Sequence, residues 1–366
     1  MKIEVQLQRN PLLIIKSTDE TILSKISCVG DPHLGRVFKT GVPSERLGER
    51  EESQYNTFFS LLNPSDPLIK VVVIMGDLFD KFIVSPTVVL RTFEIIKQAV
   101  LSNPNIRYCL IPGNHDLSKD VLRKSSYELL HLSLSKLEEE VENLTAVLHN
   151  NSYDILEVTP KCRFYLNLVA YSPFDNSNMW DNTIEQDVFL TDPLNKGVIS
   201  FGHWDSLSII DSGYVPTQKL LDKSILTISG HEHVFKSYQY PYDTNKNTVI
   251  FTGSMQPYSH AEDPEKSIYV TIDTDTLEDY DLTTLKNKCV RLYCDPMFKL
   301  EKRFDCLSLS YMAKEKEHDD LTEDDIQVLE NSYQSHMIAF FDKLGDDFSS
   351  TLKESFVNKD YSNACS

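Results

Sequence analysis

Several short runs of apolar residues in this chain end in glycine, and one of them sets the pattern. Residues 71–75, Val-Val-Val-Ile-Met, are apolar without a break and lead into Gly76 and Asp77. Such a run, rich in β-branched residues, is typical of a strand buried on both faces of a sheet. Gly76 permits a sharp turn, so Asp77 is predicted at the carboxyl edge of the sheet, where open α/β sheets place their sites. For a single Gly-Asp pair, a helix cap is the alternative.

Four other runs end in the same way. They lie at residues 25–30, 108–113, 197–202 and 224–230, and each leads directly into polar residues that can bind a metal ion. Helix caps and isolated core histidines explain one such coincidence well, but they explain five poorly. The five strand ends are therefore the predicted site.

Apolar residues at helical spacing occur between these runs. Gln54 to Leu62 shows one such pattern. Ser85 as N-cap and Pro86 as first helical residue begin the next. A leucine stripe over residues 130–148 predicts a helix that faces the core, although its last part is also compatible with a strand.

The remaining segments complete an outline of the chain. Residues 1–24 hold two strand-like runs, predicted to form a hairpin that extends a main domain at 25–275. Residues 176–194 have a loop-like composition. The acidic, turn-rich stretch from Asp273 to about Lys288 marks a boundary before a C-terminal region at 276–366. Further strands are predicted at 161–171, 249–254 and 267–272.

The composition restricts the class of protein. With 366 residues, 41% of them hydrophobic, the chain can bury a large core, yet no window has the ~18 consecutive apolar residues of a membrane helix. No long apolar segment of the signal-peptide type is present near the N-terminus. Seven scattered cysteines without a CxxC pair indicate free thiols in a reducing compartment. We therefore expect a cytoplasmic protein, in the host cytoplasm if the chain is viral.

The formal charge of −19, from 36 Lys and Arg against 55 Asp and Glu, argues against a general nucleic-acid coat. Nonspecific binding depends on neutralising phosphates, although metal ions can supply positive charge at a local site. The loop from Leu34 to Arg50 is locally basic. Within it Arg36 is a predicted substrate contact, and Lys119 is a second one farther along the chain.

The polar residues after the apolar runs have the types and spacings of metal ligands. Asp31 and His33 stand at i and i+2, as do His231 and His233, and on an extended segment such pairs point to the same side. Asn114 offers a neutral carbonyl oxygen, which suits a hard or borderline divalent ion.

The two residues after Asn114 have other expected roles. His115 must face away from its neighbour, because adjacent residues of an extended chain point to opposite sides. Asp116 is a candidate to orient an imidazole ring from behind.

In their order along the chain, these motifs resemble those of the calcineurin-like metallophosphoesterase family. They are Asp31-x-His33, Gly76-Asp77-x-x-Asp80, Gly113-Asn114-His115-Asp116, Gly202-His203 and Gly230-His231-x-His233. The resemblance covers residues 25–275 and implies an α/β fold, a four-layer α/β/β/α sandwich. It also implies two divalent ions, one held by Asp31, His33, Asp77 and His233, the other by Asp77, Asn114, His203 and His231.

The resemblance also implies a reaction. Two divalent ions about 3.5–4 Å apart clamp a phosphodiester for in-line attack. Asp77 would bridge them. His115, the one motif histidine not needed as a ligand, would donate a proton to the leaving oxygen or stabilise the charged transition state, with Asp116 orienting it. By family the expected metal is manganese, while the ligand types alone also allow iron, zinc or magnesium.

A narrower resemblance points to a substrate. Gly76-Asp77-Leu78-Phe79-Asp80 followed by Ser85-Pro86 is similar to the SbcD-type double-strand-break-repair nucleases. Gly202-His203-Trp204 is similar to the bacteriophage recombination nuclease subunits of that family. This implies a DNA exonuclease or endonuclease that works as a homodimer with an SMC-like ATPase. The alternatives are another phosphoester substrate, such as a phosphoprotein or a nucleotide, and a non-catalytic scaffold of the same fold.

The C-terminal region is predicted to add a helical appendage. Thr322 with Asp325 three residues later resembles a capping box, and Gly345 closes the pattern. Three aromatic residues lie on the apolar stripe between them, namely Tyr333, Phe340 and Phe341. Aromatic side chains of this kind dominate protein interfaces. The helix is expected either to pack on the main domain or to dock on the ATPase.

Overall fold

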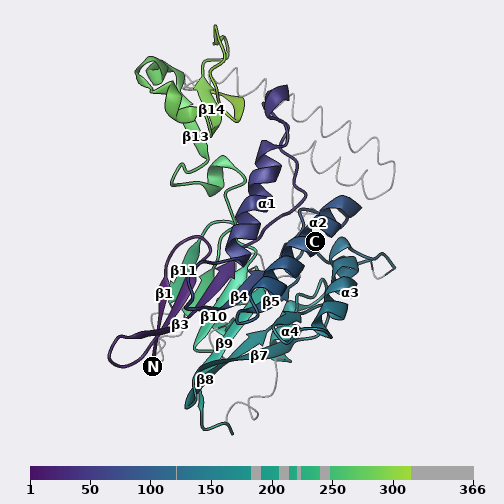
Figure 1. The fold of residues 1–366 in the computed structure, drawn as a ribbon. Helices are drawn as coiled ribbons and strands as arrows, with labels where there is room; N and C mark the ends of the chain where they lie inside the picture. Colours follow the sequence, from purple (N-terminus) through teal and green to yellow (C-terminus); the bar gives the residue numbers. More distant parts are fainter. Residues whose placement is uncertain (121, 183–190, 206–213, 221–223, 240–247, 315–366) are drawn as a thin grey trace, which may run out of the picture. The chain divides into compact units, whose positions relative to one another are not determined.

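The computed structural model describes residues 1–120, 122–182, 191–205, 214–220, 224–239 and 248–314. The strands in this part of the chain form two six-stranded sheets and one three-stranded sheet (Figure 1). The first sheet contains, in spatial order, β1 (Lys2–Gln6), β2 (Leu12–Lys16), β3 (Ile22–Val29), β4 (Ile69–Met75), β5 (Arg107–Ile111) and β6 (Leu144–Ala146). The second contains β11 (Lys236–Gln239), β12 (Thr248–Phe251), β10 (Leu226–Gly230), β9 (Asn195–His203), β8 (Cys162–Leu168) and β7 (Ser152–Thr159).

The central strands of both sheets run parallel to their neighbours. In the first sheet β4 pairs in parallel with β3 and β5, and in the second β9 pairs in parallel with β8 and β10. Parallel neighbours end at the same edge of a sheet, so the glycine-terminated strand ends of the sequence come together.

The two large sheets pack face to face, and β4 shows how its residues are divided. Val71 and Val73 are fully buried in one cluster with Phe201 of β9. The alternate residues Val72 and Ile74 belong to a second cluster, which faces the helices. Successive side chains of a strand point to opposite faces, so an uninterrupted apolar run fits a strand covered on both sides. The prediction for residues 71–75 is confirmed.

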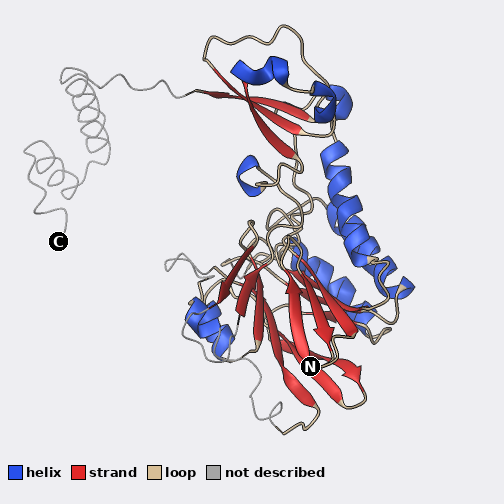
Figure 2. Cartoon of the chain, turned by 90° about the vertical axis from the view of Figure 1, so that its left-hand side faces the viewer, coloured by secondary structure: helices blue, strands red, loops and turns tan. Residues whose placement is uncertain are grey.

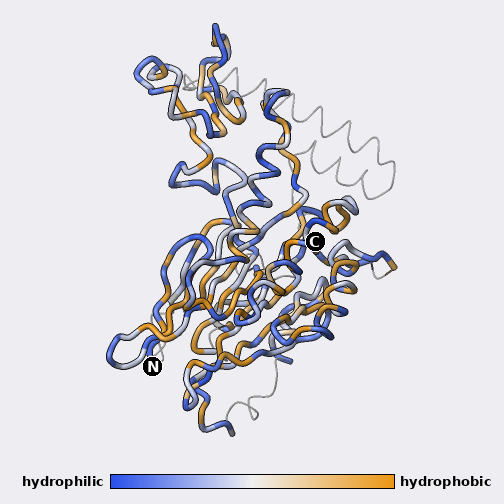
Figure 3. Tube along the Cα trace, viewed as in Figure 1, coloured by the Kyte–Doolittle hydropathy of each residue, from blue (hydrophilic) through white to orange (hydrophobic). Residues whose placement is uncertain are grey.

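Helices cover the outer faces of both large sheets (Figure 2). On the first sheet these are α1 (Glu49–Leu62), α2 (Pro86–Ser102) and α3 (Ser126–Glu138). On the second they are the short helices α4 (Asn176–Asp181) and α6 (Thr217–Leu220), where Trp180 and Leu220 pack with Trp204 and Phe251. The four-layer α/β/β/α sandwich is therefore confirmed. Figure 3 shows hydrophobic residues concentrated along the strands of the large sheets.

Two sequence-based predictions can be compared with the structure in detail. The leucine stripe over 130–148 is a helix as far as Glu138, and its last part forms strand β6, the alternative that the sequence allowed. The loop-like segment from Asn176 contains α4, whose N-cap Asp175 accepts a hydrogen bond from the backbone of Asn178. A six-residue helix shows too little periodicity to be found from sequence; its apolar anchor is the buried Trp180. Residues 183–190 lie outside the described residues.

The N-terminal hairpin is present and belongs to the first sheet. Strands β1 and β2 pair antiparallel, and β2 continues the sheet by pairing antiparallel with β3. The turn between β1 and β2 holds Arg9 and Asn10, and Asn10 has a φ of 52°, in the left-handed region that asparagine tolerates better than most residues.

The third sheet was only partly predicted. It contains β13 (Tyr269–Asp273), β14 (Cys289–Cys294) and β15 (Ser308–Ala313), and sequence patterns indicated only the first of these. The acidic stretch between β13 and β14 forms two short 3-10 helices, η3 (Thr274–Asp279) and η4 (Leu282–Leu285). Two further 3-10 turns, η1 (Ser44–Arg46) and η2 (His260–Glu262), precede this sheet in the chain.

Other predictions concern cysteines, membranes and the C-terminus. The six cysteines within the described residues are free and buried. Within the same residues, no helix combines the length and apolar character needed to cross a membrane. The helix predicted from Thr322 to Leu344 lies outside the described residues.

Candidate active site

The turns that present the predicted ligands have unusual backbone geometry. His33, Asp77 and His231 all have positive φ values, of 46°, 45° and 79°. A residue other than glycine in this region costs about 1–3 kcal/mol and persists only where the surroundings enforce it, typically at functional sites. Three such residues within one set of predicted ligands therefore mark this edge of the sheets as a site.

The glycines of the motifs are explained by close approach. A Cβ atom on Gly76, whose φ is 93°, would lie 2.4 Å from Nδ1 of His203. A Cβ on Gly113 would lie 2.2 Å from Oδ1 of Asp77. Both positions require glycine because the metal-ligand side chains pass directly over the backbone.

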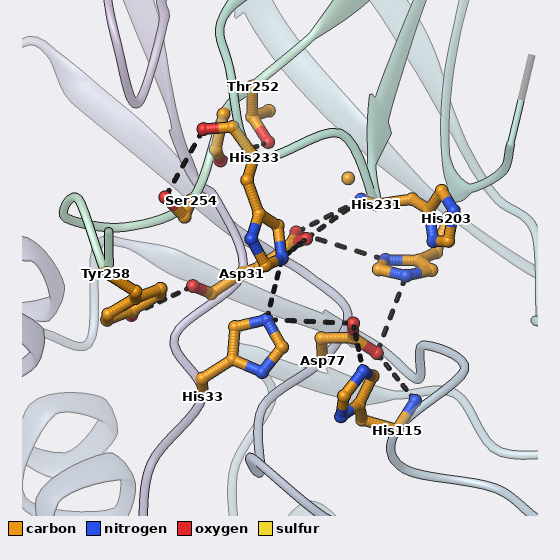
Figure 4. Close-up of polar contacts among 12 residues, drawn as sticks. Asp31, His33, Asp77, His115, His203, His231, His233, Thr252, Ser254 and Tyr258 are labelled. Atoms are coloured by element: carbon orange, nitrogen blue, oxygen red, sulfur yellow. Dashed lines mark hydrogen bonds and ion pairs between the residues drawn. The ribbon is translucent and has the colours of Figure 1, made fainter. Parts of the chain in front are cut away.

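The first ligand group consists of Asp31, His33, Asp77 and His233. Their ligand atoms all lie within 4.8 Å of one another (Figure 4). Asp31, His33 and Asp77 are buried, and His233 is partly buried. Oxygen and imidazole nitrogen ligands at this separation suit a divalent ion.

The second ligand group consists of Asp77, Asn114, His203 and His231. Oδ1 of Asn114 lies 2.9 Å from Nε2 of His203 and 2.9 Å from Nδ1 of His231. Nε2 of His203 lies 3.5 Å from Oδ1 of Asp77. The structure thus brings together all four residues predicted for a second ion.

Asp77 faces both groups with different oxygens. Its Oδ2 lies 3.8 Å from Nε2 of His33, while its Oδ1 lies 3.5 Å from Nε2 of His203. Oδ1 also accepts a hydrogen bond of 2.8 Å from the backbone N–H of His115. This is the arrangement that a bridging carboxylate requires.

Atoms behind the ligands orient two of the imidazole rings. Nδ1 of His203 lies 2.9 Å from the carbonyl oxygen of Met75. Nδ1 of His233 lies 3.4 Å from Oε1 of Glu262. Donation from Nδ1 leaves Nε2 of each ring with a lone pair directed into the site, as metal-binding histidines require. The residues of both groups therefore fit divalent ions.

The protonation states follow from burial and from neighbouring charges. Burial lowers the pKa of His33 to about 3, so this ring is neutral at physiological pH and can act as a ligand. Burial alone would raise the pKa of Asp77, but the nearby His203 holds it well below its usual range. Burial would lower the pKa of His203, yet the charges of Asp77 and Asp31 raise it to about 9. The charges of the two aspartates thus favour a positive charge at this position, which a bound divalent ion would supply in place of the proton on Nε2.

His115 lies at the rim of the site. Its side chain is 41% exposed, and its Nε2 is 4.0 Å from Oδ2 of Asp77. Its Nδ1 lies 2.6 Å from the carbonyl oxygen of Asp80. The ring also stands edge-on to that of His33, with 4.9 Å between the centroids. A fixed, partly exposed imidazole beside both ligand groups is placed to exchange a proton with a bound molecule.

Asp116 does not orient the His115 ring as expected. It accepts hydrogen bonds from three backbone N–H groups, those of Leu78, Phe79 and Gly113. These bonds fix the two turns on either side of Asp77. Burial and the charge of Asp77 raise the pKa of Asp116 to about 7. The carbonyl of Asp80 contacts His115 instead, a backbone role that no side-chain pattern could indicate.

The two predicted substrate contacts differ in position. Nη1 of Arg36 lies 3.7 Å from Oδ1 of Asp80, and its guanidinium group is 5.1 Å from the ring centroid of Tyr258. Tyr258 in turn stands edge-on to His33 at 5.4 Å, so Arg36 is next to the first ligand group. Lys119 is exposed in the loop that follows Asp116.

Part of the basic loop is structural. Arg46 pairs with Glu49 and Asp305, and the buried Arg50 donates to the carbonyl of Pro257. Neither arginine is available to a substrate phosphate. The local positive charge of this loop is therefore smaller than the sequence indicates.

Several residues that support the site lie outside the sequence motifs. The hydroxyl of Tyr258 donates to the carbonyl oxygens of Asp31 and Pro32, and Glu262 supports His233. Arg9 and Asn10 contact the same region from the N-terminal hairpin. These residues lie in no motif, and their partners are far away in the sequence, so no local signal marked them.

Comparison with known proteins agrees with this site. Residues 24–235, more than half of the chain, match the family model described as calcineurin-like phosphoesterase. The chain belongs to this family. Family membership, together with the first ligand group, makes the protein a metal-dependent phosphoester hydrolase.

Other comparisons add little. No curated protein matches the sequence. Among solved structures, the chain is similar to one entitled "GAP50 the anchor in the inner membrane complex of Plasmodium", with 13% sequence identity and a TM-score of 0.37. That likeness covers 63% of this chain and 71% of the other.

Proposed function

We propose that this phosphoester hydrolase is a DNA nuclease that cleaves phosphodiester bonds at DNA ends, in recombination or double-strand-break repair. The position of His115 is the main support. When DNA is cleaved, the leaving group is a sugar alkoxide, which leaves slowly unless it gains a proton. A positioned general acid contributes roughly 10²–10⁴-fold in rate. His115 stands beside Asp77 and is open to a bound substrate.

Two further observations favour a DNA substrate. The motifs around Asp77 and His203 are similar to those of double-strand-break-repair nucleases. Arg36, next to the first ligand group, has the fork of N–H donors that suits a phosphate oxygen. In this proposal Arg36 binds a phosphate adjacent to the scissile one, and Lys119 contacts the strand farther away.

Bound divalent ions supply the Lewis acidity that phosphoester hydrolysis needs. We propose that manganese is the biological metal. The two ligand groups would hold the ions, with Asp77 shared by both groups, and His115 would donate the proton to the leaving oxygen. Neutral histidine and asparagine ligands leave the site with net positive charge once it is loaded, which favours a phosphate anion.

Substrate profiling with manganese tests the proposal. We expect the purified chain to degrade linear duplex DNA faster than the same DNA as a closed circle, and much faster than a phosphopeptide or a cyclic nucleotide. The Asp77→Asn variant, purified identically, controls for contaminating nucleases. Efficient turnover of the phosphopeptide or nucleotide with no action on DNA would assign a different substrate. No turnover of any substrate with two ions bound would indicate a non-catalytic scaffold.

We also propose that the nuclease works as a homodimer with an SMC-like ATPase, and that residues 322–344 dock on that ATPase. Deletion of residues 315–366 should then leave metal binding and cleavage of a small aryl phosphodiester intact. The same deletion should abolish co-purification with the ATPase and any ATP-stimulated DNA cleavage. Early melting or aggregation of the shortened chain would instead make this segment part of the folded domain.

A further inference from the structure

The turn of the N-terminal hairpin reaches the metal site. Arg9, partly buried in this turn, directs its guanidinium group at two loops, one between β10 and β11 and the other after β12. Nη1 donates to the carbonyl oxygens of His233 and Ser254, at 3.2 and 2.8 Å, and to Oγ of Ser254 at 2.6 Å. Nη2 donates to the carbonyl oxygen of Glu262. A single arginine thus fixes the main chain at both His233 and Glu262.

Glu262 completes the connection through its side chain. Its Oε1 faces Nδ1 of His233 at 3.4 Å. Its carboxylate also accepts hydrogen bonds from the backbone N–H of Tyr258 and the hydroxyl of Ser259, each at 3.0 Å. Arg9 therefore holds the backbones of His233 and Glu262 while the Glu262 carboxylate orients the His233 ring.

Asn10 ties the same turn to the loop of Asp31. Its Oδ1 accepts a hydrogen bond of 2.8 Å from the N–H of Gly30, the residue before Asp31. Its Nδ2 donates at 2.8 Å to the carbonyl of Met255, and the N–H of Met255 donates at 3.1 Å to the carbonyl of Asp31. The hairpin turn is therefore bonded to the segments that present two ligands of the first group.

The histidines of the second ligand group are supported by other residues. His203 is held through Nδ1 by the carbonyl oxygen of Met75, within the central strand β4, and Nε2 of His231 lies 3.8 Å from Oδ2 of Asp205. Arg9 has hydrogen bonds to His233, Ser254 and Glu262, and none of these belongs to the second group.

From these contacts we propose that Arg9 is a positioning residue for one of the two metal ions: acting with Glu262, it fixes His233 and so sets the affinity of the first ligand group, but not that of the second. The inference rests on the two-ion site and not on the DNA substrate. A metal-binding measurement can therefore refute it independently of the nuclease proposal.

The test measures Mn²⁺ affinity at each group separately. In an Asn114→Ala background the second group is incomplete, so the tighter remaining ion reports on the first. In a His233→Ala background the roles are reversed. Adding Arg9→Gln to each background and titrating the metal-free proteins with Mn²⁺, by calorimetry or by the electron paramagnetic resonance of free Mn²⁺, isolates the effect of Arg9.

We expect Arg9→Gln to weaken Mn²⁺ binding roughly 10–100-fold in the Asn114→Ala background, the usual effect of losing a residue that supports a ligand. The same substitution should leave affinity unchanged in the His233→Ala background. Glu262→Gln should show the same selectivity. The matched control is Arg107→Gln, which removes an arginine paired with Asp154 at the other end of strand β5 and should change neither affinity.

Other results would overturn the proposal. Equal weakening in both backgrounds would make Arg9 a general stabiliser of the fold, and no weakening in either would remove it from the site. If Arg9→Gln fails to fold, as judged by circular dichroism, Arg9→Lys replaces it. That variant keeps the positive charge but loses the forked donor group that contacts several carbonyl oxygens. The proposal therefore still requires weaker Mn²⁺ binding in the Asn114→Ala background and unchanged binding in the His233→Ala background.

Discussion

The two ligand groups share Asp77 but are held in place differently. In the first group, His233 is oriented by the side chain of Glu262, and its backbone is fixed by Arg9. In the second, His203 is oriented by a backbone carbonyl, that of Met75 in the central strand β4. Substitution can remove a supporting side chain, whereas a backbone carbonyl remains whatever the residue. The orientation of His233 therefore depends on side chains outside the family motifs, whereas that of His203 depends on a backbone carbonyl supplied by the fold.

Asp77→Asn should have the largest effect on metal binding, because Asp77 is the one residue that both ligand groups share. An amide bridges two cations poorly, so both ions should be lost. We expect affinity to fall by more than ~100-fold at each group, beyond the range seen for residues that only support a ligand. Elemental analysis after reconstitution with manganese should find fewer than one ion per chain, and the rate of DNA cleavage should fall to background. The buried Asp154→Asn is the matched control; two retained ions in Asp77→Asn would contradict the bridging role.

His115→Ala should affect catalysis without affecting either group. DNA cleavage should fall roughly 10²–10⁴-fold, since a general acid is removed, while both ions stay bound. An aryl phosphodiester should lose much less, because its phenolate leaves without a proton. Rates on the two substrates and the metal content of the same samples check this. His149→Ala removes an exposed histidine and serves as control. A lost ion, or near-full DNA cleavage, would refute the assigned role.

Gly76→Ala should damage the second group selectively. The new methyl would lie 2.4 Å from Nδ1 of His203, in a backbone conformation that alanine resists. Gly48→Ala is the matched control, because Gly48 has a φ of 90° and no atom near a Cβ in that position. Both variants should lose about 1–3 kcal/mol of stability from the positive φ. Gly76→Ala should lose a further ~1–3 kcal/mol from overpacking.

Denaturant unfolding of metal-free proteins gives these stabilities, and Mn²⁺ titration gives the affinities. In Gly76→Ala the ion that depends on His203 should bind more weakly, while the one that depends on His233 should change less. Equal stabilities for the two glycine variants would show that the ring of His203 simply moves aside.

The smallest expected effect is a pH dependence of the free energy of unfolding that comes from His260. This residue lies in the 3-10 turn η2, which also contains Glu262, the residue that orients His233. Burial, followed by the charge of Arg291, lowers the pKa of His260 to about 4. The neutral ring is favoured in the folded state, so its contribution to stability is present above pH ~6.5 and is lost as the pH falls through 4. His260→Gln should remove this slope, worth ~1–2 kcal/mol after allowance for partial exposure. If His260 were uninvolved, denaturant unfolding between pH 7 and 4 would show the same loss of stability in His260→Gln as in the unchanged protein.

The sequence predicted the parts of the site that local patterns encode. Short apolar strands that end in glycine are local features, and the ligands follow each glycine directly, as at Gly76 and Asp77. Residues that support the site from distant parts of the chain leave no such local pattern. Glu262 and Arg9 belong to none of the motifs, and they support the site only because the fold brings them to His233. The role of Asp116 was misread for the same reason: backbone N–H groups have no signature in a sequence.

Other gaps have equally physical causes. Residues 176–181, which have a loop-like composition, form a helix that is anchored by the buried Trp180. Six residues are too few for helical periodicity to be recognised in the sequence. Strand β14 has one short alternation, in which the buried Val290 and Leu292 flank Arg291, and so brief a pattern gave too little signal to be noticed. The basic loop was overrated because Arg46 and Arg50 are already engaged by the protein itself.

The hydrogen bond between Arg9 and Glu262 joins residues 253 positions apart, which has a consequence for the timing of synthesis. A ribosome adding ~5–20 residues per second needs roughly 13–50 s to travel from one to the other. During that interval the hairpin turn has been made, but the loop it holds has not. The nascent chain can therefore fold much of its first sheet long before its first ligand group is complete.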